Sequence, residues 1–485
     1  MSDKLALNWI DGEWTDAADH KDSIDPATYA LIGRYASGGV AAATAAIAAA
    51  RRAFLTSPWK VDRSLRAKVL NELADAFERH TEALVGILST ENGKIRGEAM
   101  FEVSMVPAKL RYYASMVRTE YGRAAEPRPG SLSMVLREPM GVAGIIVPWN
   151  SPVVLMIRSL APALAAGCTT VVKMPGQTAQ TNALVAEVMA ESASLPRGVI
   201  NLFSEAHAEG AKWMIESPDV PTISFTGSTG TGRAISAAGA KHLKRFGLEL
   251  GGKTPMIVFD DAVLDLAVPK LEKALTVFAG QFCMTGSRLL VQRGIADALR
   301  KRLADRLREV RVGPASDPAS EMGPLIDKPN VTRVDAIVQA AIVAGAKVLV
   351  RGGPVTDGAL ARGAFYRPTL LEVSDPDMDI VQKETFGPVL TMQIFDSEAE
   401  AIELANNSEY GLAASVWTQD VNRSLRVARQ IEAGTIWIND WAVIYDEFEE
   451  GGFKQSGAGR LNGVASIDDF VQYKHITVSP GVVPA

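Results

Sequence analysis

The stretch "MGVAGIIVPWNSPVVLMIRSLAPALAAGCTTVVKM", residues 140–174, decides between a membrane protein and a folded α/β protein. It is the longest apolar region of the chain, and a membrane-spanning helix needs about 20 apolar residues without interruption. Prolines, Asn150 and Arg158 interrupt this region. The pattern therefore predicts a buried strand, a loop, a helix and a second strand, with no membrane partner.

Similar units follow along the chain. Short apolar runs at 199–203 and 222–226 are separated by helical segments, and a second alternating series covers roughly 265–439. Before them, residues 41–118 have the three- and four-residue apolar spacing of helices. Strands that alternate with helices predict a parallel, helix-covered sheet. We therefore expect an α/β fold with a Rossmann-like domain and a second α/β domain.

Composition narrows the class of protein. The chain has 485 residues, too many for one core, and a net charge of -6 that gives no nucleic-acid footprint. Two cysteines cannot form a disulfide framework, and the N-terminal residues do not resemble a signal peptide, so we expect a cytoplasmic protein. The five histidines are scattered and predict no metal site.

The segment "FTGSTGTGRAI", residues 225–235, places Gly227, Gly230 and Gly232 between a predicted strand and a predicted helix. Such a turn lets backbone N–H groups approach a phosphate at the helix N-terminus. The spacing is not GxGxxG, and glycines also serve turns that only require positive φ. A nucleotide site and a plain turn both remain open on this segment alone.

Three further residues suggest catalysis, and each has a structural alternative. Glu249 in "LELGGK" is either a general base with a raised pKa or an ion-paired strand end. Asn150 in "VPWNSP" is either a rigid oxyanion donor or an ordinary turn residue. Cys283 in "GQFCMTGSR" either packs or reacts, and its neighbours Gly280 and Gly286 favour access to the sulfur.

Together these motifs resemble the aldehyde dehydrogenase superfamily. The order and spacing of Asn150, Glu249 and Cys283 agree with that family. Further likeness lies in "NWIDGEW" near the start, "ETFGPVL" at 384–390 and "GGFKQSGAGR" at 451–460, so the resemblance extends over nearly the whole chain.

The resemblance implies a mechanism. Cys283 attacks an aldehyde carbonyl, and the Asn150 side chain and the Cys283 backbone N–H bind the oxyanion. Hydride passes to NAD or NADP and leaves a thioester on the cysteine. Glu249 then activates water to release the carboxylic acid.

The resemblance also implies a cofactor site. Gly227 and Ser228 should meet the pyrophosphate, Lys173 the adenine ribose and Glu384 the nicotinamide ribose. Gly176 replaces a glutamate that commonly binds the ribose hydroxyls, which predicts that NADP is tolerated. The remaining cofactor-binding candidates are Pro148, Trp149, Gly232, Leu250 and Phe386. Without the motifs around them, Trp149 and Phe386 would equally suit core positions.

Further departures from the family pattern concern the substrate side. Ser159 replaces a lysine sometimes assigned to a proton relay, and "FEEGG" at 448–452 replaces the usual Pro-Phe before the glycines. Arg158 stands where an aromatic residue is common, and it could pair with a substrate carboxylate or phenolate, or form a salt bridge on the helix surface. We expect a polar or aromatic aldehyde or an acid semialdehyde, with pocket walls from Ser151, Arg158, Phe282, Met284 and Tyr445.

Two alternatives to this function remain. A CoA-acylating semialdehyde dehydrogenase would usually lack Glu249, and a non-catalytic member would be expected to lack Cys283 or Glu249.

The resemblance also suggests how the chain divides and assembles. We expect a homodimer or homotetramer built through exposed strands. The expected division is an NAD(P)-binding domain at 1–120 and 140–250, a catalytic domain at 251–450, and an oligomerisation element at 121–139 and 460–485.

Overall fold

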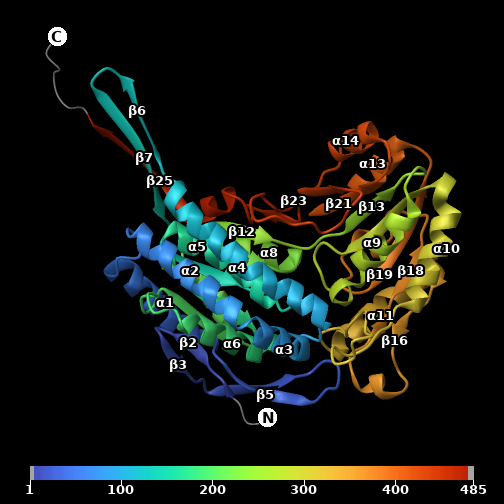
Figure 1. The fold of residues 1–485 in the computed structure, drawn as a ribbon, viewed down its shortest axis with the longest axis horizontal. Coiled ribbons are helices and arrows are strands. Elements are labelled where there is room, and N and C mark those ends of the chain that lie inside the picture. Colours follow the sequence, from blue (N-terminus) through green and yellow to red (C-terminus); the bar gives the residue numbers. More distant parts are fainter. Residues whose placement is uncertain (1–4, 479–485) are drawn as a thin grey trace.

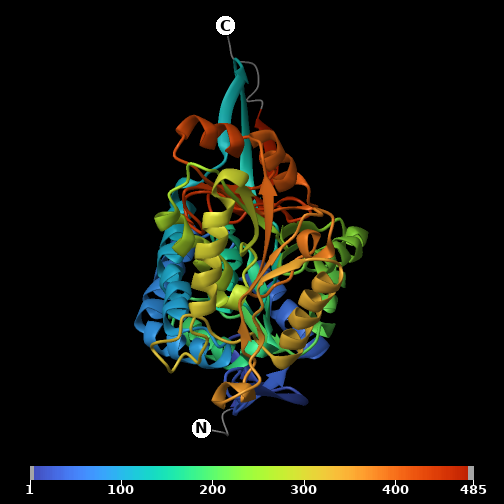
Figure 2. The same ribbon diagram turned by 90° about the vertical axis from the view of Figure 1, so that its right-hand side faces the viewer.

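The computed structural model describes residues 5–478. Two large sheets with their helices form the body of the molecule, and a long hairpin projects from it (Figure 1). The smaller sheets lie at the periphery. A sheet of β1 (Leu5–Ala6), β5 (Leu31–Ser37) and β4 (Asp19–Ile24) lies at the end opposite the hairpin (Figure 2).

The first sheet has eight strands. Five of them, from β12 to β10, run parallel, and the outer strands β24, β2 and β3 run antiparallel to their neighbours. In spatial order they are β24 (Gly457–Ala458), β12 (Arg245–Glu249), β11 (Thr222–Thr226), β8 (Val142–Ile146), β9 (Thr169–Pro175), β10 (Ile200–Glu205), β2 (Asn8–Ile10) and β3 (Glu13–Thr15).

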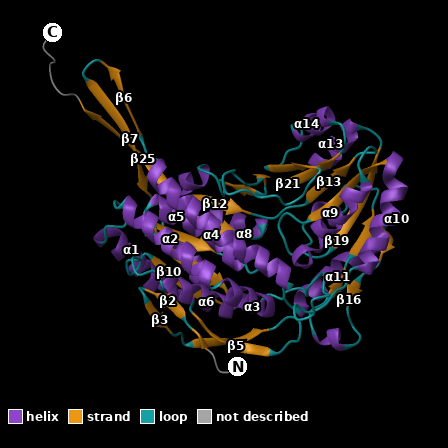
Figure 3. Cartoon of the chain, in the orientation of Figure 1, coloured by secondary structure: helices purple, strands orange, loops and turns teal. Residues whose placement is uncertain are grey.

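Helices cover both faces of this sheet because its strands are apolar on both sides. On β9, Val172 packs into one buried cluster and Val171 into another. The first cluster includes α2 (Arg63–Arg79), α3 (Thr81–Glu91), α4 (Arg96–Thr119), α5 (Pro152–Ala166) and α6 (Ala179–Ala190). The second includes α1 (Gly39–Thr56), α7 (Glu209–Glu216) and α8 (Thr229–Gly239). Helices α2, α4 and α5 lie together in front of the sheet (Figure 3).

The second sheet has seven strands, and all but the edge strand β15 run parallel. In spatial order they are β15 (Lys347–Val350), β18 (Thr369–Glu372), β19 (Val389–Phe395), β14 (Gly286–Gln292), β13 (Thr254–Val258), β21 (Ala413–Trp417) and β22 (Thr435–Ile438). Its helices are α9 (Leu264–Thr276), α10 (Arg293–Glu309), α11 (Lys328–Val343), α12 (Asp379–Gln382), α13 (Glu398–Asn406) and α14 (Val421–Ala428). Two short pairs are β16 (Gly353–Pro354) with β17 (Tyr366–Arg367), and β20 (Tyr410–Gly411) with β23 (Phe453–Lys454).

The projecting sheet combines segments that are far apart in the sequence. Strand β7 (Ser131–Pro139) pairs with β6 (Arg123–Arg128) on one side and β25 (Val471–Val478) on the other. Within residues 5–478, neither outer strand pairs with a further strand, and every residue of β6 is exposed. This sheet contains most of the residues at which the sequence predicts an oligomerisation element.

The predicted fold class is confirmed. The opening stretch folds as β8, the loop at 147–151, α5 and β9, and α5 continues through Pro162. Strands β18, β19 and β21 were not predicted, because fully buried apolar runs resemble helix segments in sequence. Within residues 5–478, no helix combines the length and apolar character that crossing a membrane requires.

Candidate active site

A cavity of about 340 Å³ lies where the carboxyl ends of β8, β11 and β12 meet the loop before β14. The carboxyl ends of parallel strands are the usual place for ligand sites in such sheets. Most of the predicted catalytic and cofactor residues line it. The lining residues are Pro148, Trp149, Asn150, Leu155, Thr226, Gly227, Ser228, Glu249, Leu250, Gly251, Cys283, Asn330, Arg333, Glu384 and Phe386.

Cys283 lies in a turn between a short helical segment and β14, and its side chain is partly exposed. Three residues just before it, Phe278, Ala279 and Gly280, have positive φ values of 50°, 54° and 72°. Such strain outside glycine tends to occur at functional sites, where surrounding structure holds it. Burial raises the pKa of the thiol to about 12, and the charge of Arg158 acts in the opposite direction.

The glycines around Cys283 have a different purpose from the one expected. A Cβ on Gly280 would overlap with the backbone of Gly387, and one on Gly286 would overlap with the Met256 side chain. These two glycines therefore permit close packing and, at Gly280, a left-handed backbone. They do not leave open space for ligands.

Asn150 is buried and lies two residues before α5. Its Nδ2 donates to the backbone oxygen of Gln281 at 3.0 Å, which ties the amide to the segment that carries Cys283. An amide nitrogen has two hydrogens, so one remains for a ligand beside the sulfur.

Glu249 is the last residue of β12 and is 6% exposed. Its Oε1 has no hydrogen-bond partner among the described residues. Burial raises its pKa to about 7, because an apolar environment disfavours the charged carboxylate. A carboxylate poised near neutrality can accept a proton from water at physiological pH.

A second carboxylate, Glu384, faces the same cavity. Burial also raises its pKa to about 7, while the Gly252 N–H, which donates to Oε1 at 3.2 Å, favours the charged form. A Cβ on Gly251 would lie 2.5 Å from Glu384 Oε2. The glycine pair after Glu249 therefore admits the Glu384 side chain.

The glycine-rich turn lines this cavity at the N-terminus of α8 (Thr229–Gly239). Helix α8 begins at Thr229, directly after Ser228, whose Oγ accepts the Thr231 N–H at 3.2 Å. Gly232 brings the helix close to Leu250, since a Cβ there would lie 2.5 Å from the leucine side chain. The positive end of α8 opens toward the cavity that holds Cys283.

Two aromatic rings complete the cavity. Trp149 and Phe386 pack edge to face with centroids 5.6 Å apart, and Phe386 has a positive φ of 51°. Arg333 of α11 donates to the backbone oxygens of Thr385 and Phe386 at 2.8 and 3.2 Å. It therefore fixes the loop that carries Glu384 and Phe386.

Lys173 and Gly176 lie apart from this lining, at the end of β9. Burial lowers the pKa of Lys173, and the opposing charge is Glu205, on the neighbouring strand β10. A Cβ on Gly176 would overlap with the Tyr35 hydroxyl and lie 2.9 Å from the Glu205 backbone oxygen. A side chain at position 176 would therefore displace Tyr35 or the end of β10.

A second cavity, of about 500 Å³, has largely apolar walls. Its charged groups are paired, Lys273 with Glu98 at 3.0 Å and Lys270 with Asp440. The lining residues are Ile95, Gly97, Glu98, Phe101, Lys270, Lys273, Val277, Phe278, Phe282, Asp440, Trp441, Ala442 and Ile444.

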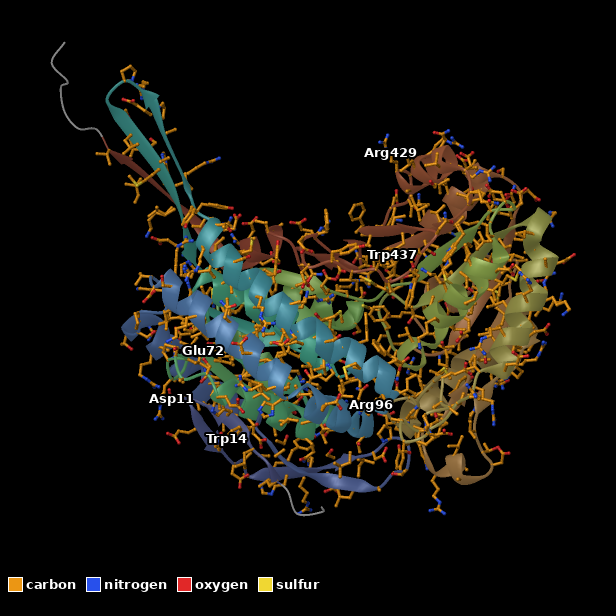
Figure 4. All side chains as sticks on the ribbon, in the orientation of Figure 1. Asp11, Trp14, Glu72, Arg96, Arg429 and Trp437 are labelled. Atoms are coloured by element: carbon orange, nitrogen blue, oxygen red, sulfur yellow. The ribbon has the colours of Figure 1, made fainter. Side chains whose placement is uncertain are left out.

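The predicted pocket walls have different outcomes. Phe282 lines the second cavity and packs edge to face with Phe278 and Trp441, at 5.7 and 5.9 Å. Met284 is a core residue instead, 1% exposed and clustered with Trp437 of β22, which Figure 4 places on the side of the second sheet toward the first.

Tyr445 and Ser151 also differ from a simple pocket wall. Tyr445 is 58% exposed and packs against Phe448. Ser151 is buried and accepts a hydrogen bond from Lys94 Nζ at 2.9 Å.

Arg158 is neither a free cation nor a surface residue. It lies in α5, 7% exposed, and pairs with Glu450 across 3.2 Å. The arginine that was expected to pair with a substrate carboxylate therefore already has a carboxylate partner, Glu450.

Several lining residues had no signal in the sequence. Asn330 and Arg333 come from α11, an ordinary amphipathic helix, and reach the cavity only because α11 packs beside the Glu384 loop. Glu450 was noticed only as a departure from the family pattern. Among the described residues, no group of three or more His, Cys, Asp or Glu side chains could hold a metal ion.

Known proteins match this chain over almost its full length. The model of the aldehyde dehydrogenase family matches residues 14–476. Betaine aldehyde dehydrogenase of Bacillus subtilis is 39% identical over 96% of either chain, and 2-hydroxymuconic semialdehyde dehydrogenase of Pseudomonas putida is 38% identical over 98% of this chain and 99% of its own.

Solved structures agree. The crystal structure of betaine aldehyde dehydrogenase from Staphylococcus aureus in complex with NAD+ superposes with a TM-score of 0.96 at 36% identity, covering 99% of this chain and 95% of that one. The family model covers most of the chain, and the sequence identity to the relatives is higher than a shared fold alone would produce. The chain belongs to the aldehyde dehydrogenase family.

Proposed function

We propose that the chain oxidises an aldehyde to its carboxylic acid through a thioester on Cys283, with Glu249 as the general base. One observation carries this proposal: Cys283, Asn150 and Glu249 come from three distant segments and line one cavity. A nucleophile, an oxyanion donor and a base near its working pKa are the groups that acyl transfer to water requires.

The side chains divide the work. The Cys283 sulfur attacks the carbonyl carbon, and the developing oxyanion lies between the free Asn150 N–H and the Cys283 backbone N–H. Because Asn150 is already fixed on the Gln281 oxygen, its donor needs little reorganisation during the reaction. The charge of Arg158 favours the thiolate over the thiol.

The first cavity fits a nicotinamide cofactor, NAD or NADP, which supplies the hydride acceptor when bound. The N-terminus of α8, with Gly227 and Ser228, suits the phosphates, and Glu384 suits the hydroxyls of the nearer ribose. Trp149 and Phe386 offer apolar surface for a flat ring. NAD+ is bound in the solved Staphylococcus aureus structure, which supports this part of the proposal.

Release of the product rests on Glu249. Its carboxylate takes a proton from water, and the resulting hydroxide attacks the thioester carbonyl and frees the Cys283 thiolate. A pKa near 7 and an unpartnered Oε1 both suit a base that must exchange protons during each turnover. This favours hydrolysis over transfer to CoA.

The substrate side favours an aldehyde with an aromatic body. Phe101, Phe278, Phe282 and Trp441 line the second cavity, and its lysines are already ion-paired. Aromatic walls without a free cation suit a ring better than a carboxylate. Arg158 is a poor partner for the carboxylate of an acid semialdehyde, because its guanidinium is already paired with Glu450.

A panel of aldehydes tests these proposals. We would measure NADH and NADPH formation with benzaldehyde, betaine aldehyde, succinic semialdehyde and hexanal, each with and without CoA. Benzaldehyde is expected to have the highest kcat/KM, with a carboxylic acid as product. A highest value for succinic semialdehyde would contradict the substrate proposal, and turnover that requires CoA would contradict hydrolysis.

Assembly and setting are also proposed here. The projecting sheet of β6, β7 and β25 has free edges that a second copy could extend, which supports a homodimer or homotetramer. The residues at 1–120 and 140–250 would bind the cofactor, those at 251–450 would carry the nucleophile, and 121–139 with 460–485 would join the subunits. Two free thiols suit a reducing compartment such as the cytoplasm. Light scattering after size exclusion would distinguish dimer from tetramer.

A further inference from the structure

The ion pair of Arg158 and Glu450 lies beside the reacting groups, yet no step above uses both members. Their side chains are 8% and 6% exposed, so water screens the pair weakly. Arg158 Nε has no hydrogen-bond partner among the described residues. Burying a guanidinium whose N–H groups are only partly hydrogen-bonded costs free energy of folding. This cost suggests that Arg158 has a functional role.

The backbone places Glu450 beside the general base. Glu450 exchanges two backbone hydrogen bonds with Leu461, at 2.7 and 2.8 Å, which closes the loop between them. Inside that loop, β24 pairs with β12, and Gly457 lies opposite Glu249. Arg158 reaches the same region from α5. Two elements far apart in sequence therefore bring one positive and one negative charge to Glu249.

Glu249 is surrounded by charges of both signs. Arg158 from α5 favours its ionised form, and Glu450 from the loop opposes it. Arg460 of the same loop acts with Arg158, and Asp469 of the segment Ala465–Phe470 acts with Glu450. Arg158 and Glu450 are the two largest charge effects on this carboxylate.

Cys283 is influenced by the same pair. Arg158 is the largest charge effect on the thiol and favours the thiolate, whereas the carboxylates Glu249, Glu384 and Glu450 oppose it. The nucleophile and the base thus share one cation, and Glu450 holds and partly neutralises that cation.

We propose that Arg158 and Glu450 are positioning residues that set the pH range in which Cys283 and Glu249 react. The pair forms a fixed dipole. Glu450, which also faces Lys109 of α4 and the Asp446 paired with it, orients the guanidinium, and the guanidinium favours the ionised forms of the nucleophile and the base. The inference rests on the proposed roles of Cys283 and Glu249.

Substitution of Glu450 by Gln tests the pair. It removes a negative charge and leaves Arg158 uncompensated, so both Cys283 and Glu249 should ionise at lower pH, by about one pH unit. Alkylation of Cys283 by iodoacetamide, followed by mass spectrometry without substrate or cofactor, should then be about tenfold faster at a fixed pH below the thiol pKa. The acid limb of kcat should move to lower pH by a similar amount.

Matched variants complete the design. Glu449→Gln removes the neighbouring exposed carboxylate and should leave both profiles unchanged. The double variant Arg158→Gln/Glu450→Gln removes both charges and should move the alkylation and kcat profiles back toward higher pH. It replaces the single variant in the test if Glu450→Gln alone does not fold. Unshifted alkylation and kcat profiles in folded Glu450→Gln would overturn the inference. Shifted alkylation without oxidation of any aldehyde would instead refute the proposed function and leave the charge assignment standing.

Discussion

The proposed cofactor side and the proposed substrate side of Cys283 are built in different ways. On the cofactor side, backbone groups and glycines dominate: the start of α8, the close contact of Gly232 with Leu250, and the glycines that admit Glu384. On the proposed substrate side, side chains from α4, α9, the segment at 277–282 and the loop at 440–444 line the second cavity and bring their own ion pairs. Backbone cradles tolerate few changes, whereas side-chain walls can change one residue at a time. The cofactor side keeps most of the expected motifs, with Gly176 as its departure, and the other departures lie on the proposed substrate side.

The largest expected effect comes from substitution of Cys283, which lies between the two sides. Cys283→Ser should lower aldehyde oxidation by about 10³-fold or more, because a hydroxyl is a far weaker nucleophile than a thiolate. Steady-state kinetics measures the loss. NAD+ binding, followed by quenching of tryptophan fluorescence, should be unchanged, and substantial residual turnover would mean that another group is the nucleophile.

Glu249→Gln should reduce steady-state turnover by about 10²–10⁴-fold, since the thioester then lacks its base. Stopped-flow absorbance should still show a burst of about one NADH per active site. In the unaltered chain the raised pKa near 7 predicts that hydrolysis slows as pH falls below 7, where the carboxyl is protonated. Turnover independent of pH between 6 and 8 would show that Glu249 is not the base.

Phe101→Ala sharpens the comparison by altering only the substrate side. This residue is 48% exposed and lines the second cavity, so the change should cost little stability. The kcat/KM for benzaldehyde should fall by roughly tenfold relative to acetaldehyde, because a ring loses an apolar wall that a small aldehyde hardly touches. The KM for NAD+ serves as control, and equal losses for both aldehydes would argue against this cavity as the substrate path.

Glu205→Gln alters only the cofactor side, with the smallest expected effect. The carboxylate accepts the Gly210 and Ala211 N–H groups at 2.8 and 3.1 Å and is the opposing charge for Lys173. Its negative charge would repel a 2′-phosphate, which counteracts the NADP tolerance expected from Gly176. Removal should raise the NADP-to-NAD ratio of kcat/KM by roughly fivefold. Glu209→Gln in the exposed first turn of α7 is the control, and an unchanged ratio would remove Glu205 from cofactor selection.

The alternation of strands and helices in the sequence was enough to predict the fold class. The order of the main helices along the chain agrees with that prediction. The parallel strands β18, β19 and β21 escaped prediction because their apolar runs carry no alternation. The core of the site was also recognisable, since Asn150, Glu249 and Cys283 stand in motifs whose local backbone is short and rigid.

Other residues were judged wrongly or missed because their surroundings come from elsewhere. Gly280 was read as open space but meets the backbone of Gly387, and Met284 was read as a pocket wall but packs with Trp437. Arg333 reaches the Glu384 loop from a helix with no motif. None of these contacts is encoded within a window of neighbouring residues.

The sequence by itself determined the α/β architecture, the candidate reacting residues and the candidate phosphate-binding turn, because each depends on local spacing and on residue chemistry. Only the tertiary structure decided the partner of Arg158. Whether that arginine waits for a substrate or is neutralised depends on Glu450, almost three hundred residues away and brought near by the pairing of β24 with β12. Charges act through space and depend on burial, so their effect on Cys283 and Glu249 can be read only from the folded chain.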